Sequence, residues 1–247
     1  MSGFFVDPEN VFDDEIRITG SDVNHIKNVM RMKAGDVINV SDGTGFTYVC
    51  EIADTGKDEL RLIIKSKKMA DTELGIRISL YQGLPKKDKM ELIIQKAVEL
   101  GVYDIYPVIT ERAVVKIDPR KVKEKVERWN RISESAAKQS GRSIIPVVHE
   151  PLSYKNALTS AVETCDTVLI PYENVKGMAY ADECINQAVR KPASAVFIGP
   201  EGGFSDEEAE LAVSMGAKAI SLGSRILRTE TAGLCTLSVM MFKAETL

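Results

Sequence analysis

From residue 76 onward, short apolar runs alternate with longer amphipathic stretches, and this alternation limits the possible folds more than any other feature. Each apolar run has the length of a buried strand, and each following stretch has the periodicity of a helix. Strands and helices that alternate in this way form a mostly parallel sheet with helices on both faces. The sequence therefore predicts an α/β domain over residues 74–247.

Parallel sheets of this kind bind ligands in the loops beyond the carboxyl ends of their strands. Three loops late in the chain are candidates, at residues 171–174, 199–204 and 223–231. We therefore expect the functional site to be built from these loops.

The first 70 residues follow a different pattern, with short alternating runs that are typical of strands. Residues 21–32 are predicted to form a helix with Ser21 as its N-cap. The stretch "SDGTG" at residues 41–45 indicates a hairpin turn. These features predict a small barrel-like β domain over residues 1–70, with a polar linker near residues 67–75.

The chain has 247 residues and a net charge of −4, but the charge is unevenly distributed. Residues 73–150 hold 15 Lys/Arg and 11 Asp/Glu, whereas the segments on either side are each net negative. A local positive excess can dock a polyanion such as RNA. A solvated helix face that interleaves both signs has the same composition, and charge alone slightly favours this second interpretation.

Four cysteines, Cys50, Cys165, Cys184 and Cys235, lie far apart and form no C-x-x-C pair. We therefore expect reduced thiols and no metal site. No apolar run approaches the roughly 20 residues that span a bilayer, and the first residues lack the features of a signal peptide. These observations predict a cytoplasmic protein.

The stretch "IGPEGGFSDEE", residues 198–208, joins an apolar run to a helix but lacks the known nucleotide-binding patterns, G-x-x-x-x-G-K-[ST] and G-x-G-x-x-G. Ser205 and Glu208 match a capping box, which occupies the free N–H groups at a helix start. Asp206 and Glu207 add negative charge there. A phosphate is thus disfavoured, and a neutral or cationic ligand such as S-adenosylmethionine fits better. The alternative is a tight turn without a ligand.

The loop at residues 223–231 and its neighbours, residues 221–232, read "SLGSRILRTETA". Ile226 and Leu227 follow Gly223 in this loop. Exposed apolar residues in a loop indicate a binding role. Apolar groups and free backbone amides suit an adenine, and arginines such as Arg228 suit a phosphodiester or a substrate carbonyl. The alternative is that the apolar pair fills the core while the arginines pair with nearby glutamates.

Together, "FIGPEGGFSDEE" and "LGSRILRTETA" resemble motifs of the RsmE family of SPOUT methyltransferases, which methylate N3 of a uridine in 16S ribosomal RNA. The blocks "KKDKMELIIQKAVELGV", "ERAVVK" and "ESAAKQSGR" resemble further family blocks in the same order. The resemblance implies a PUA-like RNA-binding domain, a SPOUT domain with a deep trefoil knot, and a homodimer. It also implies S-adenosylmethionine as cofactor and 16S rRNA of the small ribosomal subunit as partner.

The resemblance also assigns roles to individual residues. The positions that match cofactor-binding residues are Pro171, Gly199, Pro200, Glu201, Gly202, Leu222, Gly223, Ser224, Ile226, Leu227 and Thr231. The positions that match RNA-binding residues are Arg31, Lys86, Lys89, Arg112 and Arg142. The N-terminal domain departs from the family pattern, in which an arginine is expected near Gly3, a histidine in place of Asn24 and an arginine in place of Asn28.

Methylation at uracil N3 requires that a proton leave, so a general base or donors that stabilise the anionic uracil are expected. Arg142 and Arg228 are the expected donors. Glu201 is either the base or a structural brace that accepts loop N–H groups. No metal is required. The alternatives are a SPOUT enzyme that methylates a ribose 2′-O, and an RNA-binding module that has lost catalysis.

Overall fold

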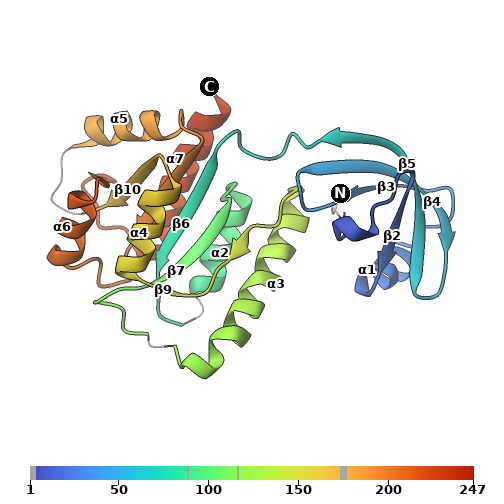
Figure 1. Ribbon diagram of the computed structural model, residues 1–247, viewed down its shortest axis with the longest axis horizontal. Coiled ribbons are helices and arrows are strands. Elements are labelled where there is room, and N and C mark those ends of the chain that lie inside the picture. Colours follow the sequence, from blue (N-terminus) through green and yellow to red (C-terminus); the bar gives the residue numbers. More distant parts are fainter. Residues whose placement is uncertain (1–3, 88, 116, 173–176) are drawn as a thin grey trace. The chain divides into compact units, whose positions relative to one another are not determined.

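The computed structural model describes residues 4–87, 89–115, 117–172 and 177–247, so Gly3 lies outside the described residues. Contacts within the chain divide it into two compact units (Figure 1). The N-terminal unit comprises Met1–Glu73 and Ala137–Ile145, and the C-terminal unit comprises Leu74–Ala136 and Pro146–Leu247. A short segment from the second half of the chain thus belongs to the N-terminal unit.

The N-terminal unit contains a five-stranded sheet in the order β1-β3-β4-β5-β2. Its strands are β1 (Phe4–Phe5), β2 (Glu15–Thr19), β3 (Val37–Ser41), β4 (Phe46–Thr55) and β5 (Glu59–Met69). The register between β4 and β5 shifts at Val49/Cys50 and again at Ile52/Asp54. Bulges of this kind bend a strand and increase its twist. The sheet therefore curls into a half-barrel, which confirms the predicted barrel-like β domain.

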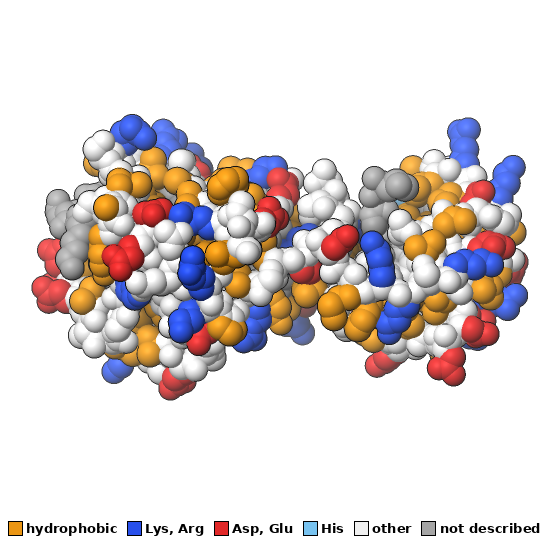
Figure 2. All heavy atoms as spheres, turned by 90° about the horizontal axis from the view of Figure 1, so that it is seen from above, with side chains coloured by type: hydrophobic (Ala, Val, Ile, Leu, Met, Phe, Trp, Pro, Cys, Tyr) orange, Lys and Arg blue, Asp and Glu red, His pale blue; other side chains and the backbone are white. Residues whose placement is uncertain are grey.

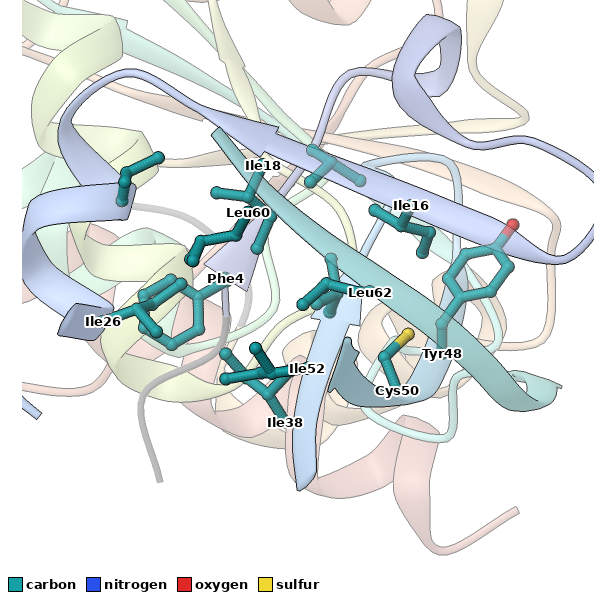
Figure 3. Close-up of a cluster of buried hydrophobic side chains, with 13 residues drawn as sticks. Phe4, Ile16, Ile18, Ile26, Ile38, Tyr48, Cys50, Ile52, Leu60 and Leu62 are labelled. Carbon is teal, nitrogen blue, oxygen red and sulfur yellow. The ribbon is translucent and has the colours of Figure 1, made fainter. Parts of the chain in front are cut away.

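One face of the curled sheet holds the core of this unit (Figure 3). Its fully buried side chains include Ile16, Ile18, Ile52, Leu60 and Leu62. They come from alternate positions of β2, β4 and β5, because successive side chains of a strand point to opposite faces. Ile26, from the helical segment after β2, packs into the same cluster.

The helix predicted over residues 21–32 is shorter than expected. Helix α1 spans Ser21–Asn24 and continues into one wide turn, η2 (His25–Val29). Its N-cap is Gly20, with φ of 74°, so the prediction of Ser21 as the cap is wrong. The turn out of β2 needs a positive φ, which places the glycine and not the serine at the cap.

The turn between β3 and β4 is organised by the buried carboxylate of Asp42. It accepts hydrogen bonds from the Thr44 N–H (2.9 Å) and hydroxyl (2.7 Å), the Phe46 N–H (3.4 Å) and the Tyr48 hydroxyl (2.9 Å). Burial raises the pKa of Asp42, but these hydrogen bonds outweigh it and hold the pKa below its ordinary value. The predicted hairpin is therefore confirmed, with its turn fixed by one ionised side chain.

The C-terminal unit contains a sheet in the order β12-β10-β11-β6-β7-β8, with β9 also paired to β7. Its strands are β6 (Arg77–Gly83), β7 (Asp104–Ile109), β8 (Val147–Val148), β9 (Leu152–Ser153), β10 (Thr167–Pro171), β11 (Ala193–Ile198) and β12 (Lys218–Ile220). Within this sheet, all pairings among the described residues are parallel, which confirms the predicted parallel sheet.

Helices cover both faces of this sheet (Figure 1). They are α2 (Lys89–Glu99), α3 (Val122–Ser140), α4 (Tyr154–Thr164), α5 (Met178–Ala188), α6 (Asp206–Ser214) and α7 (Thr229–Glu245), with the short turn η3 (Pro119–Lys121) before α3. Phe197 packs in one cluster with α4, whereas the next residue, Ile198, lies against Gly233 of α7. Within the described residues, none of the helices has the length and apolar character of a membrane span.

A row of stacked rings crosses the centre of the sheet. Phe197 stacks on Tyr81, Tyr81 on Tyr106 and Tyr106 on His149, with ring centroids 4.5, 4.5 and 4.0 Å apart. The first three rings are register partners on β11, β6 and β7. A slip of one residue would send these side chains to opposite faces, so the row fixes the alignment of the strands that lead into the candidate loops.

Replacing Asp42 by Asn is expected to destabilise the N-terminal unit by about 1–3 kcal/mol at neutral pH, because donors then lose their acceptor. The folded-state pKa is lowered, so the carboxylate stabilises the fold above its unfolded pKa, and this contribution is lost as the pH falls through the lower folded value. Unfolding curves between pH 7 and 2 should therefore converge for the two proteins in acid. Asp71→Asn, at an exposed position, is the control; equal stability of Asp42→Asn and the unmodified protein at pH 7 would contradict this role.

Candidate active site

The winding direction of the parallel sheet reverses between β6 and β11. The chain enters the sheet at β6, continues through β7 to β8, and then returns to build β10, β11 and β12 on the other side of β6. In doubly wound sheets, ligands bind at such a reversal, outside the carboxyl ends of the strands. The loops that follow Gly83 and Ile198 leave the sheet at this point.

Gly83, the last residue of β6, allows the loop after β11 to approach closely. A Cβ atom on Gly83 would lie 2.7 Å from both the Cδ and the backbone N of Pro200. Such a distance is shorter than real Cβ contacts, so a larger residue would push the 199–204 loop away. The sequence analysis did not select Gly83; its only signal is a glycine that ends an apolar strand.

The 199–204 loop is a tight turn packed against residues near Arg112. The N–H of Gly203 donates to the carbonyl of Pro200 at 2.9 Å. A Cβ on Gly202 would lie 3.0 Å from the Cβ of Arg112, whose Nη1 donates to the Gly202 carbonyl at 3.4 Å. Arg112 therefore lies beside the 199–204 loop.

The capping box predicted at the start of α6 is confirmed. The Ser205 hydroxyl accepts from the Glu208 N–H (3.2 Å), and the Glu208 carboxylate accepts from the Ser205 N–H (3.0 Å). The second oxygen of Glu208 accepts from the N–H of Glu111 at 2.9 Å. Because Asp206 and Glu207 also lie in the first turn, this helix end is unsuited to a phosphate.

Glu201 is held by two lysines from the segment that follows β6. Its carboxylate accepts from the backbone N–H of Lys86 at 3.1 and 3.3 Å. The Nζ of Lys89 lies 3.1 Å from Glu201 and 3.2 Å from Glu230, in the first turn of α7. Lys89 therefore bridges the 199–204 loop and the 223–231 loop, and it forms an ion pair with both glutamates.

Burial raises the pKa of Glu201, but hydrogen bonds from its own backbone, from Lys89 and from Lys86 outweigh that effect and hold the pKa below its ordinary value. Glu201 is therefore ionised at neutral pH. A carboxylate with a lowered pKa is a good acceptor of hydrogen bonds and a weak proton acceptor.

A chain of buried polar groups links the two loops from inside. The Gln82 amide donates to the Thr229 hydroxyl at 2.9 Å, and that hydroxyl donates to the Gly199 carbonyl at 2.6 Å. Gln82 is fully buried and Thr229 nearly so. Neither residue was selected from the sequence. A glutamine inside an apolar strand was the available signal, because buried polar groups need partners.

The 223–231 loop exposes its apolar residues. Ile226 is 86% exposed, which excludes the alternative that it fills the core, while Leu227 is half-buried. Arg228 is exposed and forms the N-cap of α7. A Cβ on Gly223 would have its nearest neighbour, the Met178 sulfur, only at 4.0 Å. The loop therefore offers apolar surface and open space, which fits a neutral adenosine.

The remaining predicted cofactor residues lie at the same edge of the sheet. Pro171 ends β10 in register with Ile220, at the end of β12. After β12, Leu222 is half-buried, whereas Ser224 and Thr231 are exposed. Residues 173 and 174 of the predicted 171–174 loop lie outside the described residues. In the described part of the chain, no three His, Cys, Asp or Glu side chains gather as a metal ion would require.

Arg142 belongs to the N-terminal unit and Arg228 to the C-terminal unit. Arg142 is only 5% exposed, and its Nε and Nη2 donate to the carboxylate of Glu73 at 3.1 and 2.5 Å. The second oxygen of Glu73 accepts from the N–H groups of Ser143 and Ile144. Burial raises the pKa of Glu73, and the contacts with Arg142 and these N–H groups more than reverse this.

Two of the N-terminal positions that depart from the family pattern, Asn24 and Asn28, lie on one helical segment. Asn28 donates to the side chain of Asn24 at 2.6 Å, so the two departures form one hydrogen-bonded pair. Arg31 follows this segment, is exposed, and has a left-handed backbone with φ of 58°. Such a conformation is uncommon outside glycine.

Comparison with known proteins identifies the family. A family profile described as "RNA methyltransferase domain" matches residues 72–241, and one described as "RNA methyltransferase PUA domain" matches residues 18–65. The chain is 38% identical to "Ribosomal RNA small subunit methyltransferase E" of Bacillus subtilis (strain 168) over 233 residues, 93% of this chain and 91% of that protein. The chain belongs to the ribosomal RNA small subunit methyltransferase E (RsmE) family.

Solved RsmE structures have the same fold. The RsmE of Neisseria gonorrhoeae, bound to S-adenosyl methionine, matches with a TM-score of 0.83 and 31% identity, covering 98% of this chain and 97% of that chain. By sequence alone, the "Ribosomal RNA small subunit methyltransferase E" of Synechocystis sp. (strain ATCC 27184 / PCC 6803 / Kazusa) is 32% identical over 92% of this chain and 73% of that protein. The predicted RsmE resemblance, with its PUA and α/β domains, is therefore confirmed.

Glu73→Ala is expected to destabilise the N-terminal unit by about 3 kcal/mol, because it leaves the buried guanidinium of Arg142 without its carboxylate. Glu73→Gln, which keeps the shape but not the charge, should cost less. Denaturant unfolding of both variants measures the difference, with the exposed Glu59→Ala as a control. If Glu73→Ala unfolds like the control, the ion pair does not stabilise the unit.

Proposed function

We propose that this chain transfers a methyl group from S-adenosylmethionine to N3 of a uridine in the 16S rRNA of the small ribosomal subunit, in the cytoplasm. The observation that carries the proposal is the 38% identity to an RsmE over 93% of this chain. The S-adenosyl methionine bound to the related Neisseria gonorrhoeae structure supports the cofactor. A helix start closed to phosphate by the α6 capping box supports it independently.

We assign cofactor binding to the two loops joined by Gln82, Thr229 and Lys89. Leu222, Ile226 and Leu227 would contact the adenine, and Gly199 to Gly202 would approach it with their backbone. When bound, S-adenosylmethionine supplies the methyl group, while N3 of the uridine gives up its proton. A site built on one rigid polar network holds reacting groups in a fixed geometry.

The catalytic assignments rest on which arginine side chain is exposed and on the direction of the pKa shift of Glu201. Arg228 is exposed beside the loops and is the proposed donor to the uracil carbonyls. Arg142 has two donors engaged by Glu73, so we assign it to holding its segment in the N-terminal unit. Glu201, ionised and bound by Lys89 and Lys86, is proposed as a brace and not as the general base.

We propose that residues 1–70 bind RNA and that residues 74–247 carry catalysis, with Arg31, Lys86 and Arg112 as RNA contacts. We also propose a homodimer, as the family resemblance implies, because α7 exposes the apolar side chains of Val239 and Phe242, and exposed apolar surface marks sites of protein–protein contact. The deep trefoil knot stays a prediction from the family.

Transfer of labelled methyl to 30S subunits and to naked 16S rRNA, followed by nucleoside analysis, tests the proposed function. We expect 3-methyluridine as the product. Label on a ribose would indicate the 2′-O activity instead. Absence of S-adenosylmethionine binding in calorimetry would favour an RNA-binding module without catalysis.

Gly83→Ala is expected to weaken S-adenosylmethionine binding by at least about ten-fold, because the added methyl displaces Pro200 and with it the first loop. Gly75→Ala is the matched control, since its Cβ would meet no atom within 4 Å. Calorimetry measures both affinities. Unchanged binding by Gly83→Ala would show that the 199–204 loop does not hold the cofactor.

Glu201→Gln distinguishes a brace from a base. As a brace, Glu201 holds Lys89 and the loop, so the variant should bind S-adenosylmethionine more weakly while the pH dependence of kcat keeps its shape. As a base, its loss would lower kcat by roughly 10²–10⁴ and remove the acidic limb of the profile. Single-turnover rates between pH 5 and 9 at saturating cofactor provide the measurement.

A further inference from the structure

A small groove lies between the segment after β6 and the start of α3. Lys86, in that segment, donates its N–H to Glu201 of the 199–204 loop. The volume of the groove is about 220 Å³, and its lining includes the buried side chains of Leu84, Met90 and Trp129. Pockets for whole small molecules usually measure about 300–1,000 Å³. A groove of this size suits one part of a larger ligand.

Cations surround this groove. Lys121, Lys125 and Arg128 line it at positions i, i+4 and i+7, so they form one stripe from the end of η3 along the first turns of α3. Lys87 lines the opposite side. The carboxylates in the lining, those of Glu91 and Glu124, number two against four cations, and the groove therefore carries an excess of positive charge.

Most of these cations form no ion pair with a carboxylate in the described part of the chain. Arg128 forms an ion pair with Glu91 at 2.7 Å. For Lys87, Lys121 and Lys125, no ion pair is found among the residues that the structure describes; the ammonium of Lys125 lies 5.9 Å from the Trp129 ring. Three exposed ammonium groups therefore surround an apolar floor, and they are available to bind an anion.

The backbone of Lys87 supports a binding role. Its φ is 56°, a left-handed conformation that is costly for a lysine. The preceding residue, Lys86, donates its N–H to Glu201 of the cofactor loop. The contact with Glu201 thus holds the strained segment next to the loop, and uncommon backbone conformations of this kind concentrate at functional sites.

On the face of the C-terminal unit drawn at the left of Figure 2, blue and red side chains both occur. The groove also lies within residues 73–150, the one segment with a net positive charge. A polyanion would therefore find its complement in this groove.

We propose that the groove binds a phosphodiester of the substrate RNA close to the methylated nucleotide, with the ribose on the apolar floor and the phosphate between Lys87, Lys121 and Lys125. The inference rests on the proposed function. Lysines act on phosphates as point charges without reading the base, so this contact sets the position of the RNA and not its sequence specificity.

The test compares two double variants of the full chain that remove the same charge. Lys121→Gln/Lys125→Gln alters the groove, whereas Arg190→Gln/Lys191→Gln alters two exposed cations near the amino ends of the strands, at the opposite edge of the sheet. The dissociation constant for naked 16S rRNA is measured from 50 to 300 mM salt. Each lost phosphate contact lowers the slope of log K against log salt by about 0.7–0.9.

We expect the groove variant to bind RNA several-fold more weakly, with a slope reduced by about 0.7–0.9 for the loss of one phosphate contact, and the control to keep the original slope. Lys87→Gly, which removes one of the three cations and relieves the backbone, should lower the slope by no more than the same amount, about 0.7–0.9. Calorimetry with S-adenosylmethionine, which should be unchanged, checks that the groove variants are folded.

Unchanged slopes in the groove variants, with RNA binding and methyl transfer intact in the unmodified protein, would overturn the groove and leave the proposed function standing. An equal loss in the control would also overturn it, because the effect would then be general electrostatics. An unmodified protein that binds no RNA would overturn both.

Discussion

The hydroxyl of Thr229 is the group on which the candidate site depends. It receives a hydrogen bond from Gln82 of β6 and donates one to Gly199 after β11, and it stands at the start of α7. Leaving such a buried group unpaired costs about 1–3 kcal/mol. These hydrogen bonds therefore hold β6, the 199–204 loop and α7 in one arrangement. A second connection between the loop and α7 is made by Lys89, which forms ion pairs with Glu201 and Glu230.

Local patterns predicted the elements of this structure well. Hydrophobic periodicity indicated the parallel sheet, and the S-x-x-E spacing from Ser205 to Glu208 indicated the capping box, because both depend on neighbours within one or two turns. The partners that assemble the site are distant: Gln82 and Thr229 are 147 positions apart. No spacing rule reaches that far, so Gln82, Gly83 and the bridge made by Lys89 required the structure.

The sequence did not settle the environment of individual side chains. Arg142 matches a family position, and the structure shows that its side chain is buried and paired with Glu73. For Ile226 the sequence left a core position and an exposed position open, and the structure shows that it is exposed. An arginine or an isoleucine has the same letter in either environment, and only tertiary contacts decide which environment it occupies.

The N-terminal unit is discontinuous along the chain. Two of its carboxylates, Asp22 and Glu73, bind Lys138 and Arg142, which lie in the segment Ala137–Ile145. Chains are synthesised from the N-terminus, and domains fold as their residues become available. The half-barrel can form early, but its ion pairs cannot close until residue 142 has left the ribosome, so the last step in completing the first unit waits for more than half of the chain to be translated.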